Sequence, residues 1–335
     1  MIMTDLLPIY HPDLPPLLAA LAETPPMDRL RRVGMNCGCE YTRFPVFQAG
    51  RTYNRCVHSL GVGAIVWHFT SDPAQAAAGL LHDVATPTFA HVVDFLRGDY
   101  LTQEATEAGT RELIAGSPEL TAVLDRFGLT PDRVADYHLY PIADNDSPRL
   151  SADRLEYTLS NGLNFGFLAS EQAADLYGDL SVAPNETGEA ELCFRSRDRA
   201  LLFARTALAC ARVYVSPADR YCMQLLSELL AKAVGEGILA EADLWADEPL
   251  VIDALERSPL APAWEAFRSL RSVRTAPPSA EPPDDRPWRR IPAKKRCIDP
   301  LIRDQGRASA LDPAFAADLS AFLSEPQTEW ILASA

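Results

Sequence analysis

The sequence lacks the features that mark membrane, secreted or nucleic-acid-binding proteins. No apolar run reaches the roughly 18 to 20 residues that a membrane helix needs. The N-terminus has no basic segment ahead of an apolar one, which a signal peptide would have. We therefore expect a cytoplasmic protein without a membrane partner. The net charge of −15, from 46 acidic and 31 basic residues, argues against general nucleic-acid binding through a basic surface.

Cysteine is also too sparse for a disulfide framework. The chain of 335 residues has seven cysteines, an odd number, and they are scattered along it. Cys37 and Cys39 are separated by one residue, but no second pair of this kind exists. We therefore expect reduced thiols in the core or in loops rather than disulfides or a zinc knuckle.

Helical periodicity is what the sequence has in abundance. From about residue 54 to 270, apolar residues recur at three- and four-residue spacing, as in HSLGVGAIVWHF and PAQAAAGLLHDV. Alanine and leucine, both strong helix formers, dominate these segments. Strand-like alternation is scarce, and ELCFRSR is either a strand or an extended link. Residues 33–54, rich in glycine and aromatics, suggest a short hairpin or an irregular loop. The predicted fold is mainly α, with a small β-hairpin near the N-terminal side of the site.

A proline-rich segment divides the chain. APPSAEPPDDRPW, at residues 276–288, holds five prolines and three acids and is therefore a linker or an extended strap. We predict a catalytic domain over residues 1–275 and a basic, partly helical C-terminal extension over residues 289–335. The extension includes RRIPAKKR, which either packs as a solvated strap on the acidic body or helps to hold a nucleotide or a partner subunit.

Three segments combine histidine and aspartate in a way that suggests a metal site. They are NRCVHSLGV at 54–62, LLHDVATPTFAH at 80–91 and LSADRLEYTLSN at 150–161. His82 and Asp83 end an apolar helical pattern, ahead of Pro87, and burying them there is costly unless they bind something. His58 lies in a second helical segment and Asp153 begins a third. Taken singly, a helical histidine is more often packed or solvated, and an aspartate at a helix start is favoured by the helix dipole.

The order of these motifs resembles the HD superfamily of metal-dependent phosphohydrolases. It is most similar to the deoxynucleoside triphosphate triphosphohydrolase branch that has a sterile-alpha-motif/HD architecture. The details that match this branch are Arg55 three residues before His58, the run HSLGV, the residues Pro87, Phe89 and His91 after His82 and Asp83, and Tyr157 four residues after Asp153. The resemblance covers roughly residues 30 to 240 and implies an HD-domain helical bundle.

The resemblance also implies roles for individual residues. The metal ligands would be His58, His82, Asp83 and Asp153, holding a divalent ion such as Fe, Mn, Zn, Co or Mg. Arg55 would contact the substrate phosphate through its planar guanidinium, or else pair helices. Tyr157 would pack against the sugar, or else belong to the core. His91 would contact phosphate or lie near the metal, or else be a buried, hydrogen-bonded imidazole.

The chain departs from the branch at positions that serve acid–base chemistry and sugar recognition. Thr86 replaces a catalytic histidine, and Gln103–Glu104 replaces a His–Glu pair. Asn161 replaces an aspartate that binds a sugar hydroxyl, and Asn36 falls near a glutamine that reads the same sugar. Because threonine and glutamine do not donate protons near neutral pH, either Glu104, Glu107 or His91 acts as acid or base, or the chemistry differs from triphosphate release. Thr86, Gln103, Asn161 and Asn36 would then face the substrate.

Three functions are compatible with this pattern. The first is a metal-dependent phosphohydrolase that cleaves a phosphate ester of a nucleotide or deoxynucleotide with metal-activated water. The second is a catalytically altered HD protein that binds a nucleotide as a sensor or structural partner. A di-iron oxygenase ranks third, because Thr86 and Gln103 remove two histidines that a second iron would need. A homo-oligomer is expected from the resemblance alone.

Overall fold

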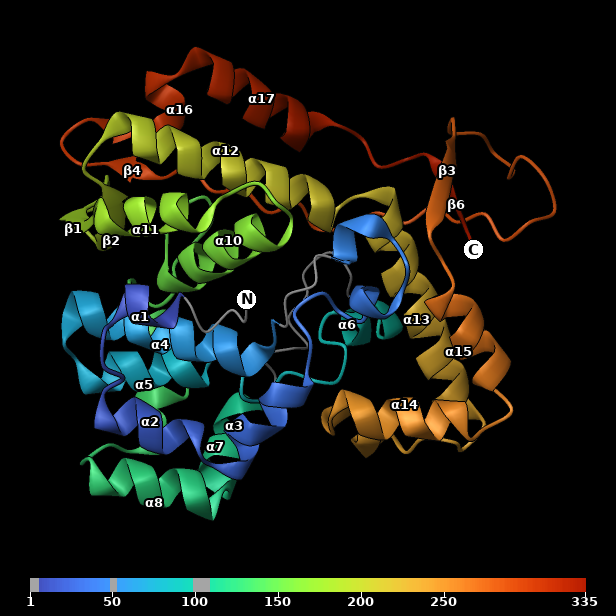
Figure 1. Ribbon diagram of the computed structural model, residues 1–335, viewed down its shortest axis with the longest axis horizontal. Coiled ribbons are helices and arrows are strands. Elements are labelled where there is room, and N and C mark those ends of the chain that lie inside the picture. Colours follow the sequence, from blue (N-terminus) through green and yellow to red (C-terminus); the bar gives the residue numbers. More distant parts are fainter. Residues whose placement is uncertain (1–5, 49–52, 99–108) are drawn as a thin grey trace.

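The computed structural model describes residues 6–48, 53–98 and 109–335 (Figure 1). Helices dominate it and the sheets are small, so the prediction of a mainly α fold with a small hairpin is confirmed. Among the described helices, none combines the length and apolarity needed to span a membrane.

The helices and strands follow one another in two halves. The first half contains α1 (Leu7–Tyr10), α2 (Pro16–Ala22), α3 (Pro25–Arg29), α4 (Arg55–Thr70), α5 (Pro73–Leu81), α6 (Val92–Leu96), α7 (Thr110–Gly116), α8 (Pro118–Arg126), α9 (Pro131–Val134) and α10 (Ala152–Asn164). The second half contains α11 (Ser170–Gly178), β1 (Leu180–Pro184), β2 (Ala190–Phe194), α12 (Arg197–Tyr214), α13 (Pro217–Gly235), α14 (Glu248–Glu256), α15 (Ala261–Arg268), β3 (Ser272–Ala276), β4 (Leu301–Ile302), β5 (Gly306–Arg307), α16 (Ala308–Leu311), α17 (Pro313–Ser324) and β6 (Trp330–Ser334). Short 3-10 turns are η2 (Leu30–Arg32), η3 (Cys39–Tyr41), η4 (Pro45–Phe47), η5 (Tyr137–Leu139) and η6 (Glu241–Trp245).

The helices form two groups, which we call lobes: the first contains α2, α4, α5, α10 and α12, and the second α13, α14 and α15. Helices α4 and α5 form the centre of the first lobe. Asn54 caps α4 by accepting a hydrogen bond from the Val57 amide, and Asp72 caps α5 in the same way. Gly63 permits close packing, because a Cβ there would lie 2.9 Å from the Cβ of Leu80. This close approach brings the start of α4 beside the end of α5.

The hairpin lies elsewhere than the sequence suggested. Strands β1 and β2 form it, with Leu180 paired to Phe194, and ELCFRSR supplies β2. Within residues 33–54, the described part contains η3, η4 and one isolated bridge between Gly34 and Asn54, and is therefore an irregular loop. Two successive left-handed residues, Cys37 at φ 53° and Gly38 at φ 80°, turn the chain where a strand would need extended backbone.

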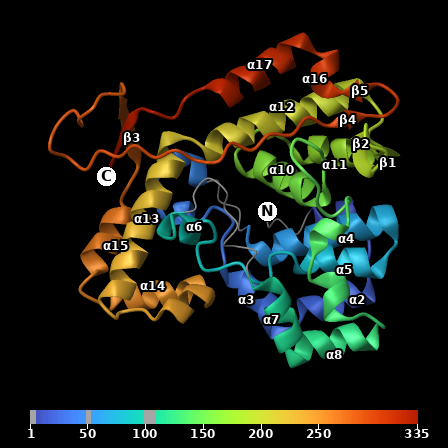
Figure 2. The same ribbon diagram turned by 180° about the vertical axis from the view of Figure 1, so that it is seen from behind.

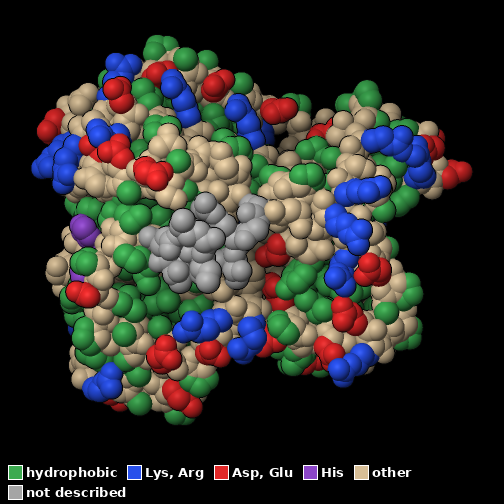
Figure 3. All heavy atoms as spheres, in the orientation of Figure 1, with side chains coloured by type: hydrophobic (Ala, Val, Ile, Leu, Met, Phe, Trp, Pro, Cys, Tyr) green, Lys and Arg blue, Asp and Glu red, His purple; other side chains and the backbone are tan. Residues whose placement is uncertain are grey.

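Two hydrophobic clusters divide the interior. The first joins α2, α4, α5, α10 and α12, with Leu18, Ile65 and Leu159 fully buried in it. The second joins α13, α14 and α15 with the loop after α5, and includes Leu226 and Trp264. In Figure 1 the corresponding helices form separate groups, with α14 and α15 standing apart from α4 and α5. The space-filling view shows a run of Lys and Arg side chains over the lobe of α15 and β3, with acidic side chains beside it (Figure 3).

The C-terminal part of the chain connects both groups of helices. Strand β3 pairs antiparallel with β6, and Arg289 bridges to Ile331. Residues 291–300, which we call the C-terminal strap, are extended and lead to β4, which pairs with β2. Figure 2 shows this segment crossing the molecule from the side of β3 to β4. The strap therefore spans the region between the two lobes.

Candidate metal centre

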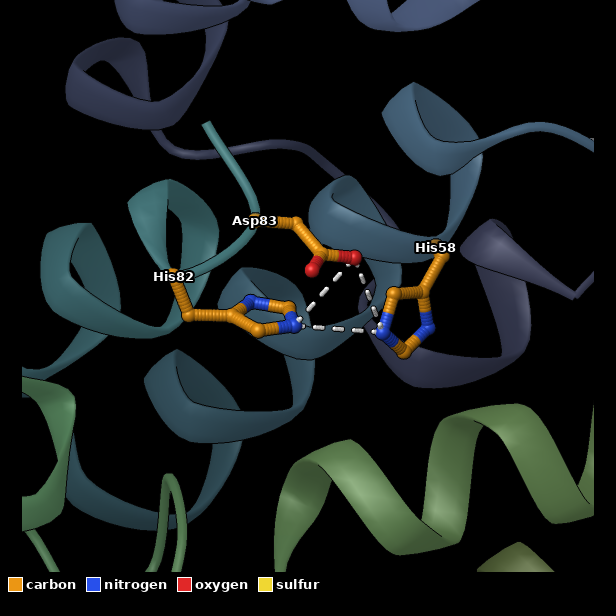
Figure 4. A group of neighbouring side chains, drawn as sticks. All are labelled: His58, His82 and Asp83. Atoms are coloured by element: carbon orange, nitrogen blue, oxygen red, sulfur yellow. Dashed lines mark hydrogen bonds and ion pairs between the residues drawn. The ribbon is translucent and has the colours of Figure 1, made fainter. Parts of the chain in front are cut away.

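Four side chains from three helical segments converge at one end of a pocket. His58 lies in the first turn of α4, His82 directly follows α5, and Asp153 is the second residue of α10. The sequence therefore located the helix end at His82 correctly. Figure 4 shows His58, His82 and Asp83 pointing toward one another.

The distances between the converging atoms suit a shared cation. The Nε2 atoms of His58 and His82 are 3.3 Å apart, and Asp153 Oδ1 lies 3.0 Å from the first and 3.6 Å from the second. Asp83 Oδ2 lies 3.6 Å from His82 Nε2 and 3.9 Å from His58 Nε2. Ligand atoms about 2.0 to 2.2 Å from one ion lie roughly 3.0 to 3.5 Å from their neighbours. His58, His82 and Asp83 therefore form a group that could hold a single divalent metal, and Asp153 lies beside both imidazoles.

Hydrogen bonds on the far side of each imidazole fix its tautomer. His82 Nδ1 lies 2.7 Å from the carbonyl oxygen of Gly79, which only accepts, so Nδ1 carries the proton. His58 Nδ1 lies 2.6 Å from Glu156 Oε2 and donates to that carboxylate. In both rings the remaining nitrogen, Nε2, faces the convergence point and is the atom that a metal would bind once it gives up any proton. This is the arrangement that metal-binding histidines adopt.

Both oxygens of Asp83 have protein donors. Arg55 Nη1 donates to Oδ2 at 2.7 Å, and the Thr86 hydroxyl donates to Oδ1 at 2.8 Å. Thr86 is fully buried and is not among the residues that line the pocket. The described contacts therefore make Thr86 an orienting partner of Asp83, and its direct contact with substrate stays a prediction.

Even without a metal, the two carboxylates of this site carry the negative charge that a cation site needs. Burial raises the pKa of Asp153, but hydrogen bonds from His58 and His82 outweigh it and hold that pKa well below its usual range. Burial is likewise outweighed at Asp83, where the charge of Arg55 lowers the pKa. For His58, hydrogen bonds with Asp153 and Glu156 overcome the effect of burial and raise the pKa to about 10. Two carboxylates thus draw positive charge to this point.

Glu156 is a functional residue that the sequence reasoning missed. It is almost fully buried and accepts from the Tyr53 hydroxyl and, at 2.6 Å, from the Ser160 hydroxyl, as well as from His58. A buried carboxylate needs such partners to offset its desolvation. The neighbouring Gly61 leaves room for it, because a Cβ there would lie 2.6 Å from Glu156 Cγ. A signal was present in the sequence, since Glu156 follows Asp153 by three residues and shares its helix face.

The pocket extends from the metal end between the two lobes. Its volume is about 680 Å³, and Asn36, Tyr157 and Asn161 line it together with the four proposed ligands. Tyr157 packs edge-on against Tyr214. Asn161 Nδ2 donates to the Tyr214 hydroxyl at 2.8 Å, while its buried Oδ1 has no hydrogen-bond partner among the described residues. This part of the pocket therefore offers aromatic surface and a hydrogen-bond acceptor.

His91 also lines the pocket, but other residues engage both of its ring nitrogens. Nδ1 lies 2.8 Å from Asp94 Oδ2, and Nε2 lies 3.2 Å from Arg296 Nη2 on the C-terminal strap. Arg296 is the last residue of RRIPAKKR, the stretch for which the sequence left open a solvated strap or a role in holding a nucleotide or a partner subunit. The remaining predicted residues, Gln103, Glu104 and Glu107, lie outside the described residues.

Two curated proteins are similar to most of this chain. No family model matches the chain. The chain is 24% identical to the metal-dependent phosphohydrolase cns2 of Cordyceps militaris over 303 residues. The matched region covers 87% of this chain and 81% of that protein. The chain is 24% identical over 249 residues to the uncharacterized protein YdhJ of Bacillus subtilis, covering 72% of this chain and 71% of that protein.

A solved structure shares the whole fold. The crystal structure of a phosphohydrolase (BT4208) from Bacteroides thetaiotaomicron superposes with a TM-score of 0.60 over 96% of both chains, at 17% sequence identity. This likeness shows a shared fold, and His58, His82 and Asp83 form a group that could hold a metal ion. The deoxynucleoside triphosphate branch stays a prediction.

Proposed function

We propose that this protein is a metal-dependent phosphohydrolase that cleaves a phosphate ester of a nucleotide or deoxynucleotide. The observation that carries the proposal is the convergence of two imidazole Nε2 atoms and two carboxylates at the end of a pocket large enough for such a substrate. The name of the Cordyceps militaris relative supports the same reaction class.

His58, His82, Asp83 and Asp153 would hold the metal. Imidazole and carboxylate donors suit Fe, Mn, Zn or Co, and carboxylates also suit Mg. When bound, such an ion lowers the pKa of water from about 15.7 toward 7 and stabilises negative charge on a phosphoryl group. The protein's own part is to fix both imidazoles through Glu156 and the Gly79 carbonyl, and Asp83 through Arg55 and Thr86.

The rest of the pocket matches the remainder of a nucleotide. Tyr157 and Tyr214 offer aromatic faces for a sugar or base. The unpartnered Oδ1 of Asn161 is suited to a hydroxyl or amino donor on the substrate, since a buried acceptor without a partner is costly. Asn36 lines the same pocket and remains a candidate substrate contact.

The test begins with purified protein and metal analysis. The apo form is reloaded separately with Fe, Mn, Zn, Co and Mg. Each form is then assayed against mono-, di- and triphosphates of ribo- and deoxynucleosides, with orthophosphate and triphosphate release measured separately. We expect hydrolysis that needs the metal and is lost in His58→Gln.

His68→Gln is the matched control, because His68 lies on the same helix and contacts the Tyr10 carbonyl outside the pocket. It should retain both metal and activity. Metal-loaded protein that binds nucleotides but releases no phosphate would instead support the sensor hypothesis.

A further inference from the structure

A second pocket lies next to the pocket at the metal centre. Its volume is about 310 Å³, and Asn36 and Phe47 line both pockets. Its walls come from the loop of η3 and η4, the residue that caps α4, the end of α10 and the start of α14. A volume of this size can enclose a small organic molecule. The proposed hydrolysis gives no role to this space, which we call the second pocket.

Two carboxylates meet in the second pocket. Glu248 is 2% exposed, and its Oε1 accepts from the Gly34 amide at 2.8 Å while its Oε2 accepts from the Tyr41 hydroxyl at 2.6 Å. Glu40 Oε1 accepts from the Asn36 amide at 3.3 Å. Gly34 makes room for both side chains, because a Cβ there would overlap Glu40 Oε1 and lie 3.4 Å from Glu248 Oε1. The two carboxylates therefore flank the same point of the backbone.

In the described part of the chain, neither carboxylate is ion-paired with a lysine or an arginine. Arg31 and Arg32 also line the second pocket, but each is paired with an aspartate, at 3.2 and 2.6 Å. Burial and the neighbouring charge of Glu40 raise the pKa of Glu248 to about 8, against the opposing charge of Arg55. Burial also raises the pKa of Glu40. The pair thus retains a proton at neutral pH, and a bound cation would favour its ionised form.

Two buried acceptors of the second pocket have no hydrogen-bond partner among the described residues. One is Glu40 Oε2, and the other is Oδ1 of Asn164, a side chain that is 7% exposed. Glu40 belongs to η3 and Asn164 is the last residue of α10, so the two acceptors come from different elements. A buried acceptor without a partner is costly. A ligand that suits this pocket therefore donates hydrogen bonds rather than accepting them.

The second pocket also has aromatic walls. The aromatic side chains that line it are Tyr41, Phe47, Tyr53 and Phe165. Aromatic faces attract cations, and they form the cages that hold organic ammonium groups. A hard metal ion is a poorer match, because Mg²⁺ and Ca²⁺ take about six or more oxygen ligands. Within the described ranges, potential metal ligands cluster in threes at the metal centre alone.

We propose that the second pocket binds a small organic cation through its ammonium group, which Glu40, Glu248 and the Asn164 side-chain oxygen hold together. A primary ammonium group has three donors and a positive charge, which complement three acceptors without a cationic partner. The aromatic walls would cover its carbon chain. None of the four proposed metal ligands lines the second pocket, so this binding does not depend on the proposed function.

Calorimetric titration of the purified full-length protein tests this binding. The probes are butylamine, putrescine and spermidine, with butanol as the uncharged analogue of butylamine and with magnesium and calcium chloride as inorganic cations. We expect at least one amine to bind and butanol not to bind. Because the carboxylate pair retains a proton, amine binding at about pH 7 should release protons. Titrations in two buffers that differ in ionisation heat measure this release.

Glu40→Gln and Glu248→Gln test the two carboxylates. Each amide keeps the shape of the side chain but removes the charge, so amine binding should weaken at least about tenfold. Both variants should fold, since a neutral amide is easier to bury than a carboxylate. Glu256→Gln is the matched control, because Glu256 is exposed on the same helix, α14, and lines neither pocket. It should bind the amine as the wild type does.

Three outcomes would overturn the assignment. The first is a wild-type protein that binds none of the amines at millimolar concentration. The second is equal amine binding in the wild type and in the folded Glu40→Gln and Glu248→Gln variants. The third is magnesium or calcium binding that exceeds amine binding and is lost in both variants, since the second pocket would then be a metal site.

Discussion

The pocket has two walls that are built in different ways. One wall is formed by the helices α4, α5 and α10. Its polar side chains are buried and hydrogen-bonded: His58, for example, is only 2% exposed and has a partner at each ring nitrogen. The opposite wall includes an extended strap whose Arg296 is half-buried. Helices fix a ligand atom more precisely than an extended segment does. The first wall is thus suited to coordinating an ion, and the second to holding a variable substrate.

The largest effect is expected from removing a proposed ligand on the helical wall. His82→Ala and Asp153→Asn should each lose bound metal and lower kcat by at least about 10³-fold. Without the cation, the transition state loses several kcal/mol of charge stabilisation. Metal analysis and steady-state kinetics check this. By contrast, Arg296→Gln should keep its metal. A His82→Ala protein that retains both metal and activity would contradict the assignment of metal binding to the helical wall.

Gly61 tests how tightly the helical wall is packed. An alanine at this position would place its Cβ 2.6 Å from Glu156 Cγ, so Glu156 must move and its contact with His58 is lost. We expect Gly61→Ala to lower the free energy of unfolding by about 1 to 3 kcal/mol, and to weaken metal binding. Denaturant titration and metal titration measure these effects.

Gly178→Ala is the control for that variant. Gly178 also lies in a helix, and a Cβ there would meet nothing within 4 Å. It should be neutral or slightly stabilising, because alanine is the better helix former. Equal stability losses in the two variants would show that the α4–α10 contact is not as tight as described.

Glu156→Gln has a smaller expected effect on the same wall. The amide preserves the shape of the side chain but removes the negative charge that His58 Nδ1 contacts at 2.6 Å. Metal affinity should fall about 10- to 100-fold, as for other partners of metal-bound histidines. Competition with a chelator of known affinity measures the change. An unaltered affinity would reduce Glu156 to a purely structural residue.

The same contrast explains what the sequence could predict. The helical wall depends on local sequence patterns. The spacing of apolar residues predicted α4 and α5, and the cost of burying His82 and Asp83 at a helix end indicated a metal site. Glu156 escaped notice because a helical glutamate usually faces solvent, and its burial depends on Gly61 of another helix.

The sequence suggested that RRIPAKKR is a strap, but not which of its residues reach the pocket, because their contacts are distant in the chain. Arg296 meets His91 across 205 positions, and an extended segment without hydrophobic periodicity gives no sign of where it packs. The hairpin was similarly misplaced, since the left-handed residues Cys37 and Gly38 turn a segment whose aromatics suggested strands.

The last and smallest effect concerns Asp219, on the second wall near Arg296. Burial raises its pKa to about 8, although Arg296 opposes this. In the unfolded chain its pKa is about 3.9, so between about pH 4 and 8 the folded state binds more protons and stability falls as pH rises. Asp219→Asn stays neutral, so its stability relative to wild type should increase by about 1 kcal/mol between about pH 6 and pH 7. Urea unfolding at both pH values measures this, and a pH-independent difference would show that Asp219 is ionised in the folded protein.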